Sequence, residues 1–148
     1  MRRFALAAAV VILQLELVLM QFDCDGKSGF HPDPVQCDKY YECRDGEANP
    51  RLCKDGLVFL ANNPLYERCD FPFAVHCGSR TELQPATSSA NCPRKYGLFP
   101  HSVATNCKTF WQCNDGVASK MSCQTGLAFN PATGTCQWKY LVPKCQAQ

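Results

Sequence analysis

Cysteine is the residue type in this chain best suited to chemistry, and the 148-residue sequence contains twelve of them. Cysteine thiolates either bind metal ions or pair as disulfides. Zinc-binding cysteines usually come in pairs with two to four residues between them, whereas no two cysteines here are closer than five intervening residues. The three histidines, His31, His76 and His101, form no cluster in the sequence. We therefore expect disulfide bonds, and neither a metal site nor another cofactor.

The N-terminal segment indicates the compartment in which the disulfides would form. Arg2 and Arg3 precede an unbroken apolar run of ten residues, 4–13. A membrane-spanning helix needs roughly 20 apolar residues, and Glu16 would be costly inside one. A secretory signal needs only a charged start and a shorter apolar core. A signal peptide is thus favoured over a membrane anchor, which predicts a secreted, extracellular protein with no membrane segment after cleavage and with oxidised cysteines.

The cysteines are spaced as a repeat. Successive cysteines from Cys24 to Cys77 are separated by 12, 5, 9, 15 and 7 residues, and those from Cys92 to Cys145 by 14, 5, 9, 12 and 8. We call residues 24–77 the first repeat and residues 92–145 the second repeat. Each spans 54 residues, which is too few for comfortable stability by packing alone. Three disulfides in each, at roughly 3 kcal/mol apiece, can make up the shortfall.

The segment between the repeats, residues 78–91, has the composition of a linker. It is rich in Ser, Thr, Pro and Ala and contains no aromatic residue. A flexible chain of this length has an end-to-end distance of about 20 Å, so we expect two domains on a short tether. The predicted organisation is a signal peptide over residues 1–21, a first domain over 22–79, a linker over 80–90 and a second domain over 91–148.

Each repeat is predicted to form two β-hairpins. Asp-Gly is a strong signal for a two-residue hairpin turn, and Asp45-Gly46 and Asp115-Gly116 each follow the third cysteine of their repeat. A second hairpin is expected between the fourth and fifth cysteines. No stretch after residue 22 has helical periodicity of useful length. The expected fold is small, disulfide-rich and β: two tandem domains, each with a short antiparallel sheet and a second hairpin, stapled by three disulfides.

Two adjacent aromatic residues lie on the first predicted strand of each repeat. Side chains alternate between the two faces of a strand, so one of each pair should pack on the disulfides and the other should face solvent. Core packing explains any single aromatic, but two neighbours cannot both face a one-sided core. Flat apolar rings beside hydrogen-bonding groups suit sugar rings, and Asn130 is placed to bind an acetamido group. The residues of this candidate exposed platform are Tyr40, Tyr41, Phe59, Phe71, Phe110, Trp111, Phe129, Asn130 and Trp138.

This combination of features resembles the peritrophin-A type chitin-binding domain, a carbohydrate-binding module of family 14. Both repeats have the cysteine spacing, the aromatic pair, the Asp-Gly turn and a Gly-Leu-x-Phe segment after the fourth cysteine, at residues 56–59 and 126–129. Residues 77–85 and 92–100 are similar to segments of the obstructor proteins, insect cuticular proteins analogous to peritrophins. Obstructor proteins usually contain three such domains, whereas this sequence contains two.

The resemblance implies a secreted, non-enzymatic protein that binds chitin in cuticle or a related extracellular matrix, with other cuticle proteins as further partners. It also implies a disulfide pairing. Six cysteines allow fifteen pairings, and spacing alone does not choose among them. The resemblance implies first-to-third, second-to-sixth and fourth-to-fifth. In this chain the implied pairs are Cys24–Cys43, Cys37–Cys77, Cys53–Cys69, Cys92–Cys113, Cys107–Cys145 and Cys123–Cys136.

Other function classes find less support. The sequence has no Ser/His/Asp trio with supporting context, no H-E-x-x-H motif and no Gly-rich phosphate loop, so we do not expect an enzyme. The second repeat has six basic and one acidic residue, against six and nine in the first. Its basic residues are scattered rather than clustered, so nucleic acid is not an expected partner. The alternative function is that of a soluble disulfide-rich defence effector, either a protease inhibitor or an antimicrobial protein.

Overall fold

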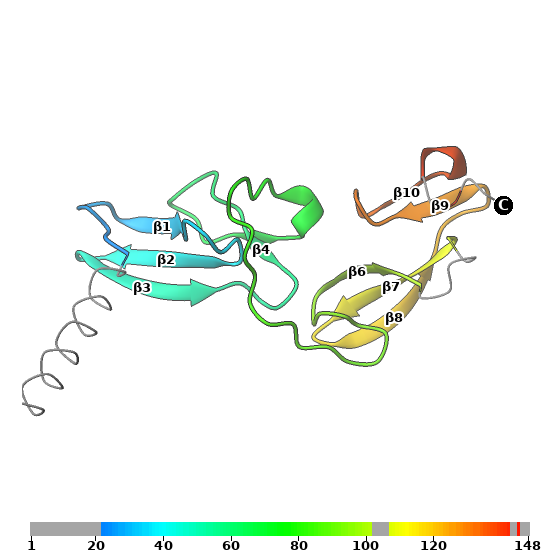
Figure 1. Cartoon of the computed structure of the whole chain (residues 1–148), viewed down its shortest axis with the longest axis horizontal. Coiled ribbons are helices and arrows are strands. Elements are labelled where there is room, and N and C mark those ends of the chain that lie inside the picture. Colours follow the sequence, from blue (N-terminus) through cyan, green and yellow to red (C-terminus); the bar gives the residue numbers. More distant parts are fainter. Residues whose placement is uncertain (1–21, 102–106, 143–144, 146–148) are drawn as a thin grey trace, which may run out of the picture.

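The computed structural model describes residues 22–101, 107–142 and 145, and this part of the chain is almost entirely β (Figure 1). The predicted signal peptide lies outside the described residues. Among those that are described, no helix has the length and apolar character needed to cross a membrane.

Each repeat contains one three-stranded antiparallel sheet and one two-stranded hairpin (Figure 1). The elements of the first repeat are β1 (Gly29–Pro32), β2 (Lys39–Arg44), β3 (Glu47–Leu52), β4 (Val58–Phe59), β5 (Cys69–Asp70) and the short 3₁₀ helix η1 (Pro72–Ala74). Those of the second repeat are β6 (Gly97–Pro100), β7 (Thr109–Asn114), β8 (Val117–Ser122), β9 (Leu127–Asn130), β10 (Thr135–Trp138) and η2 (Lys139–Leu141). The predicted fold class is confirmed.

The Asp-Gly turns form where the sequence predicts them. Both residues of each turn have positive φ, 53° and 82° at Asp45-Gly46 and 50° and 78° at Asp115-Gly116, the backbone that matches the twist of a two-residue hairpin. The turns connect β2 to β3 and β7 to β8. The sequence analysis missed β1 and β6, which pair with β2 and β7. Each is only four residues long and ends in proline, a residue confined to edge positions of sheets.

All twelve cysteines form disulfides, in the pairing that the family resemblance implied. No thiolate is therefore left to bind zinc. The second hairpin of each repeat is hydrogen-bonded to the segment that leads into its sheet. In the first repeat the N–H of Phe59 donates to the carbonyl of Cys37 at 2.9 Å, and in the second the N–H of Phe129 donates to the carbonyl of Cys107 at 2.8 Å. The small core of each repeat lies between these two layers.

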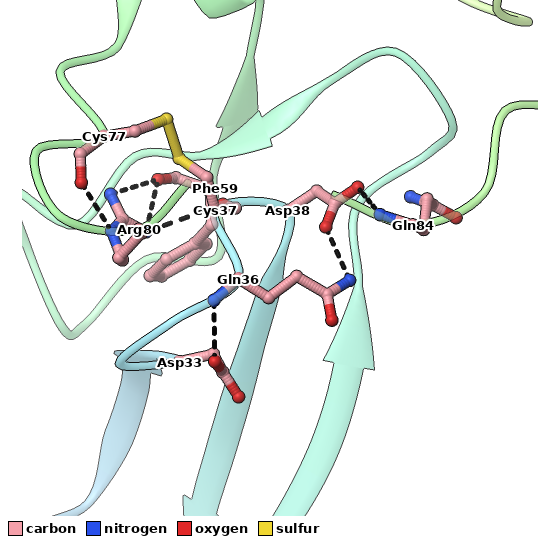
Figure 2. The surroundings of a disulfide bond; sticks show 8 residues. All are labelled: Asp33, Gln36, Cys37, Asp38, Phe59, Cys77, Arg80 and Gln84. Carbon is pink, nitrogen blue, oxygen red and sulfur yellow. Dashed lines mark hydrogen bonds between the residues drawn. A yellow bond between two sulfur atoms is a disulfide. The ribbon is translucent and has the colours of Figure 1, made fainter. Parts of the chain in front are cut away.

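The segment between the repeats is bound to the first repeat rather than free in solvent (Figure 2). The Arg80 guanidinium donates to the carbonyl oxygens of Phe59 and Cys37 at 3.4 and 3.5 Å. Further along, the backbone N–H of Gln84 donates to the buried carboxylate of Asp38 at 2.9 Å, and its side-chain amide donates to the Cys53 carbonyl at 2.9 Å. These bonds replace the flexible tether that the composition suggested.

Asp55, a buried residue of the first repeat, connects this segment to the second repeat. Its carboxylate accepts hydrogen bonds from the backbone N–H of Thr87 at 2.8 Å and of Lys95 at 3.2 Å. It also accepts one from the Arg94 guanidinium at 2.7 Å. Burial raises the pKa of Asp55, but these donors outweigh burial and lower it below its usual value. We call Asp55 with Thr87, Arg94 and Lys95 the junction.

A close backbone approach reinforces the junction. The carbonyl of Asp55 accepts from the N–H of Tyr96 at 2.9 Å. Gly56 has φ +105°, and a Cβ on it would lie 1.8 Å from the Tyr96 carbonyl oxygen. The first and second repeats therefore meet through backbone as well as side chains, and a residue larger than glycine at position 56 would separate them.

Candidate functional site

Four of the predicted binding residues form two stacked pairs inside the repeats. Tyr40 of β2 stacks on Phe59 of β4, with ring centroids 4.5 Å apart, and Phe110 of β7 stacks on Phe129 of β9 at 4.2 Å. The exposed fractions of Tyr40, Phe59 and Phe129 are 2 %, 0 % and 4 %. The expectation of an exposed platform is therefore wrong for Tyr40, Phe59 and Phe129, whereas Phe110 is half-buried. They pack there because the second hairpin lies over that face of the sheet.

Tyr40 also shows which aromatic of the adjacent pair packs on a disulfide. It forms a core cluster with Cys53 and Phe59, against which Cys69 packs, and Cys53 and Cys69 are joined to each other. Its hydroxyl donates a hydrogen bond to the carboxylate of Glu67. Burial, followed by the hydrogen bond to Glu67, raises the pKa of the Tyr40 phenol well above its usual value. Tyr40 is thus a structural residue of the first repeat.

The second aromatic of each pair lies on the opposite face of its sheet. In the first repeat, Phe22 stacks on Tyr41 with ring centroids 4.1 Å apart and planes within 7° of parallel. The Tyr41 hydroxyl donates to Asp33 at 3.0 Å, and Lys39 lies 3.1 Å from the same carboxylate oxygen. In the second repeat, His101 stacks on Trp111 at 5.4 Å. The rings of Tyr41 and Trp111 are both half-buried. Contrary to the sequence expectation, neither ring points fully into solvent.

The polar cluster around Asp33 occurs in the first repeat only. Burial raises the pKa of Asp33, but two backbone N–H donors, Lys39 and Tyr41 together outweigh it and lower the pKa to about 2. The second repeat has His101 in place of Asp33 and Thr109 in place of Lys39. The ionised carboxylate therefore fixes the orientation of Tyr41, and no matching acid acts on Trp111.

Trp138 is the predicted binding residue with the clearest exposure. It ends β10, opposite Leu127 in β9, and 56 % of it is accessible to solvent. The same hairpin is closed by the Cys123–Cys136 disulfide. The side chain of Asn130 holds the turn of this hairpin, since its amide donates to Gln137 at 2.9 Å and its carbonyl accepts from the Ala132 N–H at 3.0 Å. Asn130 is thus engaged with the protein itself.

Phe71 lies at the corresponding place in the first repeat, but its surroundings differ. It stacks on Phe73 at 5.2 Å. Phe73 in turn contacts the second repeat, where a Cβ on Gly134 would come within 2.3 Å of its ring. The first repeat's hairpin therefore faces the second repeat, whereas Trp138 faces solvent.

The structure thus divides the predicted platform into three locations: the buried stacks, the outer faces of the sheets and the second hairpins. The sequence analysis missed Phe22, Asp55 and Phe73. One signal was available for Asp55, because aligning the repeats by their cysteines sets it opposite the uncharged Thr125. Within the described residues, no group of three or more His, Cys, Asp or Glu side chains is arranged to hold a metal ion.

Comparison with known families agrees with the repeat structure. The model of a family described as the chitin binding Peritrophin-A domain matches residues 24–77 and residues 92–145. The chain belongs to this peritrophin-A family. Both of its peritrophin-A domains have the three-disulfide framework described above.

Three relatives show how such domains are arranged elsewhere. The chain is 39 % identical over 126 residues to protein obstructor-E of Drosophila melanogaster, covering 85 % of this chain and 51 % of that protein. It is 33 % identical over 127 residues to chitin-binding domain protein cbd-1 of Caenorhabditis elegans, covering 84 % and 9 %. It is 28 % identical over 151 residues to peritrophin-1 of Anopheles gambiae, covering 92 % and 95 %. The chain spans about half of obstructor-E and nearly all of peritrophin-1.

Proposed function

We propose that this protein is a secreted, non-catalytic chitin-binding protein of cuticle or another chitinous extracellular matrix. The proposal is supported by the match of both repeats to the peritrophin-A family. The second hairpins offer rings on a support closed by disulfides. Chitin, a polymer of N-acetylglucosamine, is the proposed partner, with other cuticle proteins as further partners in the same matrix.

The exposed Trp138 is the observation that best supports a binding role. A sugar ring has apolar C–H faces and polar edges, so an exposed aromatic ring can stack on the face while neighbouring polar groups bond to the edge. Trp138 offers the larger of the two aromatic systems at corresponding positions and is held by a disulfide-closed hairpin. A rigid ring loses little conformational entropy on binding.

The second repeat is proposed to bind chitin more tightly than the first. Phe71 is smaller than Trp138 and stacks on Phe73, which contacts the second repeat. Its free surface for a sugar is correspondingly reduced. The two sites still act together, because a polymer offers many equivalent positions and the junction sets the relative placement of the repeats before binding. Avidity of roughly 10²–10⁴ over a single site is within reach of such linkage.

The test is retention of the full chain on chitin beads, compared with three variants. Trp138→Ala should reduce affinity by at least about tenfold, equivalent to roughly 1.4 kcal/mol, and Phe71→Ala should reduce it by about threefold or less. Tyr66→Ala is the matched control: Tyr66 is 67 % exposed and belongs to the loop between β4 and β5, and it is not one of the predicted binding residues. It should bind as the unmodified chain does. Disulfide mapping of each variant shows whether the framework is intact.

Two results would contradict the proposal. Failure of the correctly paired full chain to bind chitin would remove the function itself, and inhibition in a protease panel or microbial killing would then support the effector alternative. Equal binding by the full chain and Trp138→Ala would keep the function but move the site elsewhere.

A further inference from the structure

The outer aromatic face is covered in the first repeat. Phe22, two residues before the first cysteine, lies nearly parallel to Tyr41 at a centroid distance of 4.1 Å. Stacking at this distance and angle covers one face of the Tyr41 ring with another flat ring. The Tyr41 hydroxyl is at the same time bonded to Asp33. One face of the Tyr41 ring is therefore covered by Phe22, which lies just before the first repeat in the sequence.

The second repeat has no such ring before its first cysteine; the ring that stacks on Trp111 is His101, at a centroid distance of 5.4 Å. The residue two positions before its first cysteine is Ala90, whose methyl group cannot cover an indole. Here the structure has a cleft of about 230 Å³. We call it the Trp111 cleft. Its apolar wall comprises Phe99, Pro100 and Trp111, and Ser88, Ser89 and Asn91 form its polar side.

The cleft is built from both the sheet and the inter-repeat segment. Phe99 lies opposite Trp111 in the register of β6 and β7, and its ring folds back over Gly97. On the other side, Ser89 and Cys92 exchange backbone hydrogen bonds at 2.9 and 3.1 Å, and the Ser89 hydroxyl donates to the Gly116 carbonyl at 2.5 Å. The polar side is thus held in place before any ligand arrives.

We propose that the Trp111 cleft binds one N-acetylhexosamine ring. The inference rests on the proposed function and adds a second contact to the chitin surface, separate from the hairpin of Trp138. The volume is below the roughly 300–1,000 Å³ of sites for drug-sized ligands, which suits a single sugar.

The chemistry of the lining favours a sugar over an aromatic side chain. Aromatic and proline surfaces suit the C–H face of a pyranose. Hydroxyl and amide groups on the opposite side suit its hydroxyls and acetamido group. A phenyl ring in the same place would form no hydrogen bonds with the polar groups of Ser88 and Asn91. The cleft contains no charged side chain among its lining residues, which agrees with an uncharged ligand.

The experiment uses the full chain, whose two tryptophans give two indole N–H signals in NMR. The Trp138→Phe variant assigns them. Titration with the N-acetylglucosamine trimer should shift the Trp111 signal saturably. Phe99→Leu, which removes one wall, should weaken that response at least fivefold. Ala90→Phe, which adds a ring where the first repeat has Phe22, should weaken it at least tenfold.

The outcomes separate this inference from the proposed function. A Trp111 signal that stays unchanged while the Trp138 signal moves and chitin beads retain the chain would overturn the cleft and leave the function standing. A Trp111 response that persists undiminished in both variants would also overturn it. A Trp111 signal that shifts with protein concentration in the absence of sugar would assign the cleft to a second copy of the chain. Absence of bead retention and of both shifts would remove the function together with the cleft.

Discussion

The two repeats share a framework but use their outer surfaces differently. In the first, Phe22 covers Tyr41, Asp33 bonds its hydroxyl, and the hairpin residue Phe71 lies beside Phe73 at the contact with the second repeat. In the second, His101 stacks on Trp111, which also lines the Trp111 cleft, and Trp138 is exposed. The outer rings of the first repeat are thus in contact with other side chains of the protein, whereas in the second repeat Trp138 remains exposed.

This difference shows that duplication of a fold does not duplicate a site. The disulfides and the inner stacks are the same in both copies because each is needed to form the domain. The outer residues are free of that requirement. In the first repeat, Asp55 and Phe73 contact the second repeat. The surface around these two residues is therefore not accessible to a ligand.

The largest effect is expected where the two repeats are alike. Phe59→Ala and Phe129→Ala each remove a buried ring from a small core and should cost about 3–5 kcal/mol. Amide hydrogen exchange in the full chain should show loss of protection in the strands of the affected repeat alone. Val117→Ala, at an exposed strand position, should stay within about 0.5 kcal/mol. If one ring can be removed without loss of protection, the two cores are less alike than their stacks indicate.

The junction is the next test, because it holds the first repeat against the second. Asp55→Ala leaves three donors without their acceptor and should cost about 1–3 kcal/mol. It should also open residues 80–90 to proteolysis and lower chitin retention toward that of the second repeat alone. Glu47→Ala, an exposed acid on β3, is the control. A resistant segment in the Asp55→Ala protein would show that Arg80 and Gln84 alone hold it.

Acid should affect the outer face of the first repeat more than that of the second. Because the pKa of folded Asp33 is about 2, below its usual 3.8, the ionised carboxylate stabilises the fold at neutral pH. This contribution, at most about 2.5 kcal/mol, is lost as the pH falls from about 4 toward 2. NMR of the Tyr41 ring should report the loosening. Asp33→Asn should abolish the pH dependence at Tyr41 while Trp111 stays unaffected.

The junction shares this acid sensitivity. The pKa of Asp55 is also lowered, so its stabilising effect is likewise present above the usual carboxyl pKa and disappears in acid. The Asp33→Asn protein distinguishes the acid response of Asp33 from that of Asp55, because its remaining acid response should be confined to residues around the junction.

The smallest effect is expected from salt and chelators. The second repeat is basic and the first acidic, so charge is a rival explanation for tighter binding by the second. If ring stacking and hydrogen bonds dominate, raising ionic strength from about 0.1 to 1 M should change retention by less than about twofold, since screening acts on charges. EDTA should have no effect. Release by modest salt would instead assign the difference between the repeats to charge.

Much of the fold was predictable because its determinants are local. The Asp-Gly turns need only two residues with positive φ, and the repeated cysteine spacing marks the domains. The strands β1 and β6 were missed because four residues ending in proline are too short to show alternation. Of the predicted platform, Trp138 is exposed, but Phe59 and Phe129 are buried. Strand alternation predicts on which face of the sheet a side chain lies, but not which other element covers that face.

The sequence by itself determined the domain family, the number of repeats, the two hairpins in each and, through the family resemblance, the disulfide pairing. Those features follow from residue types at fixed spacing. Only the tertiary structure decided which rings are exposed, that Phe22 covers Tyr41, and that Asp55 binds the second repeat. Such contacts join residues 19 or more positions apart in the chain. They depend on how sheet, hairpin and linker pack in space, and no local pattern records that packing.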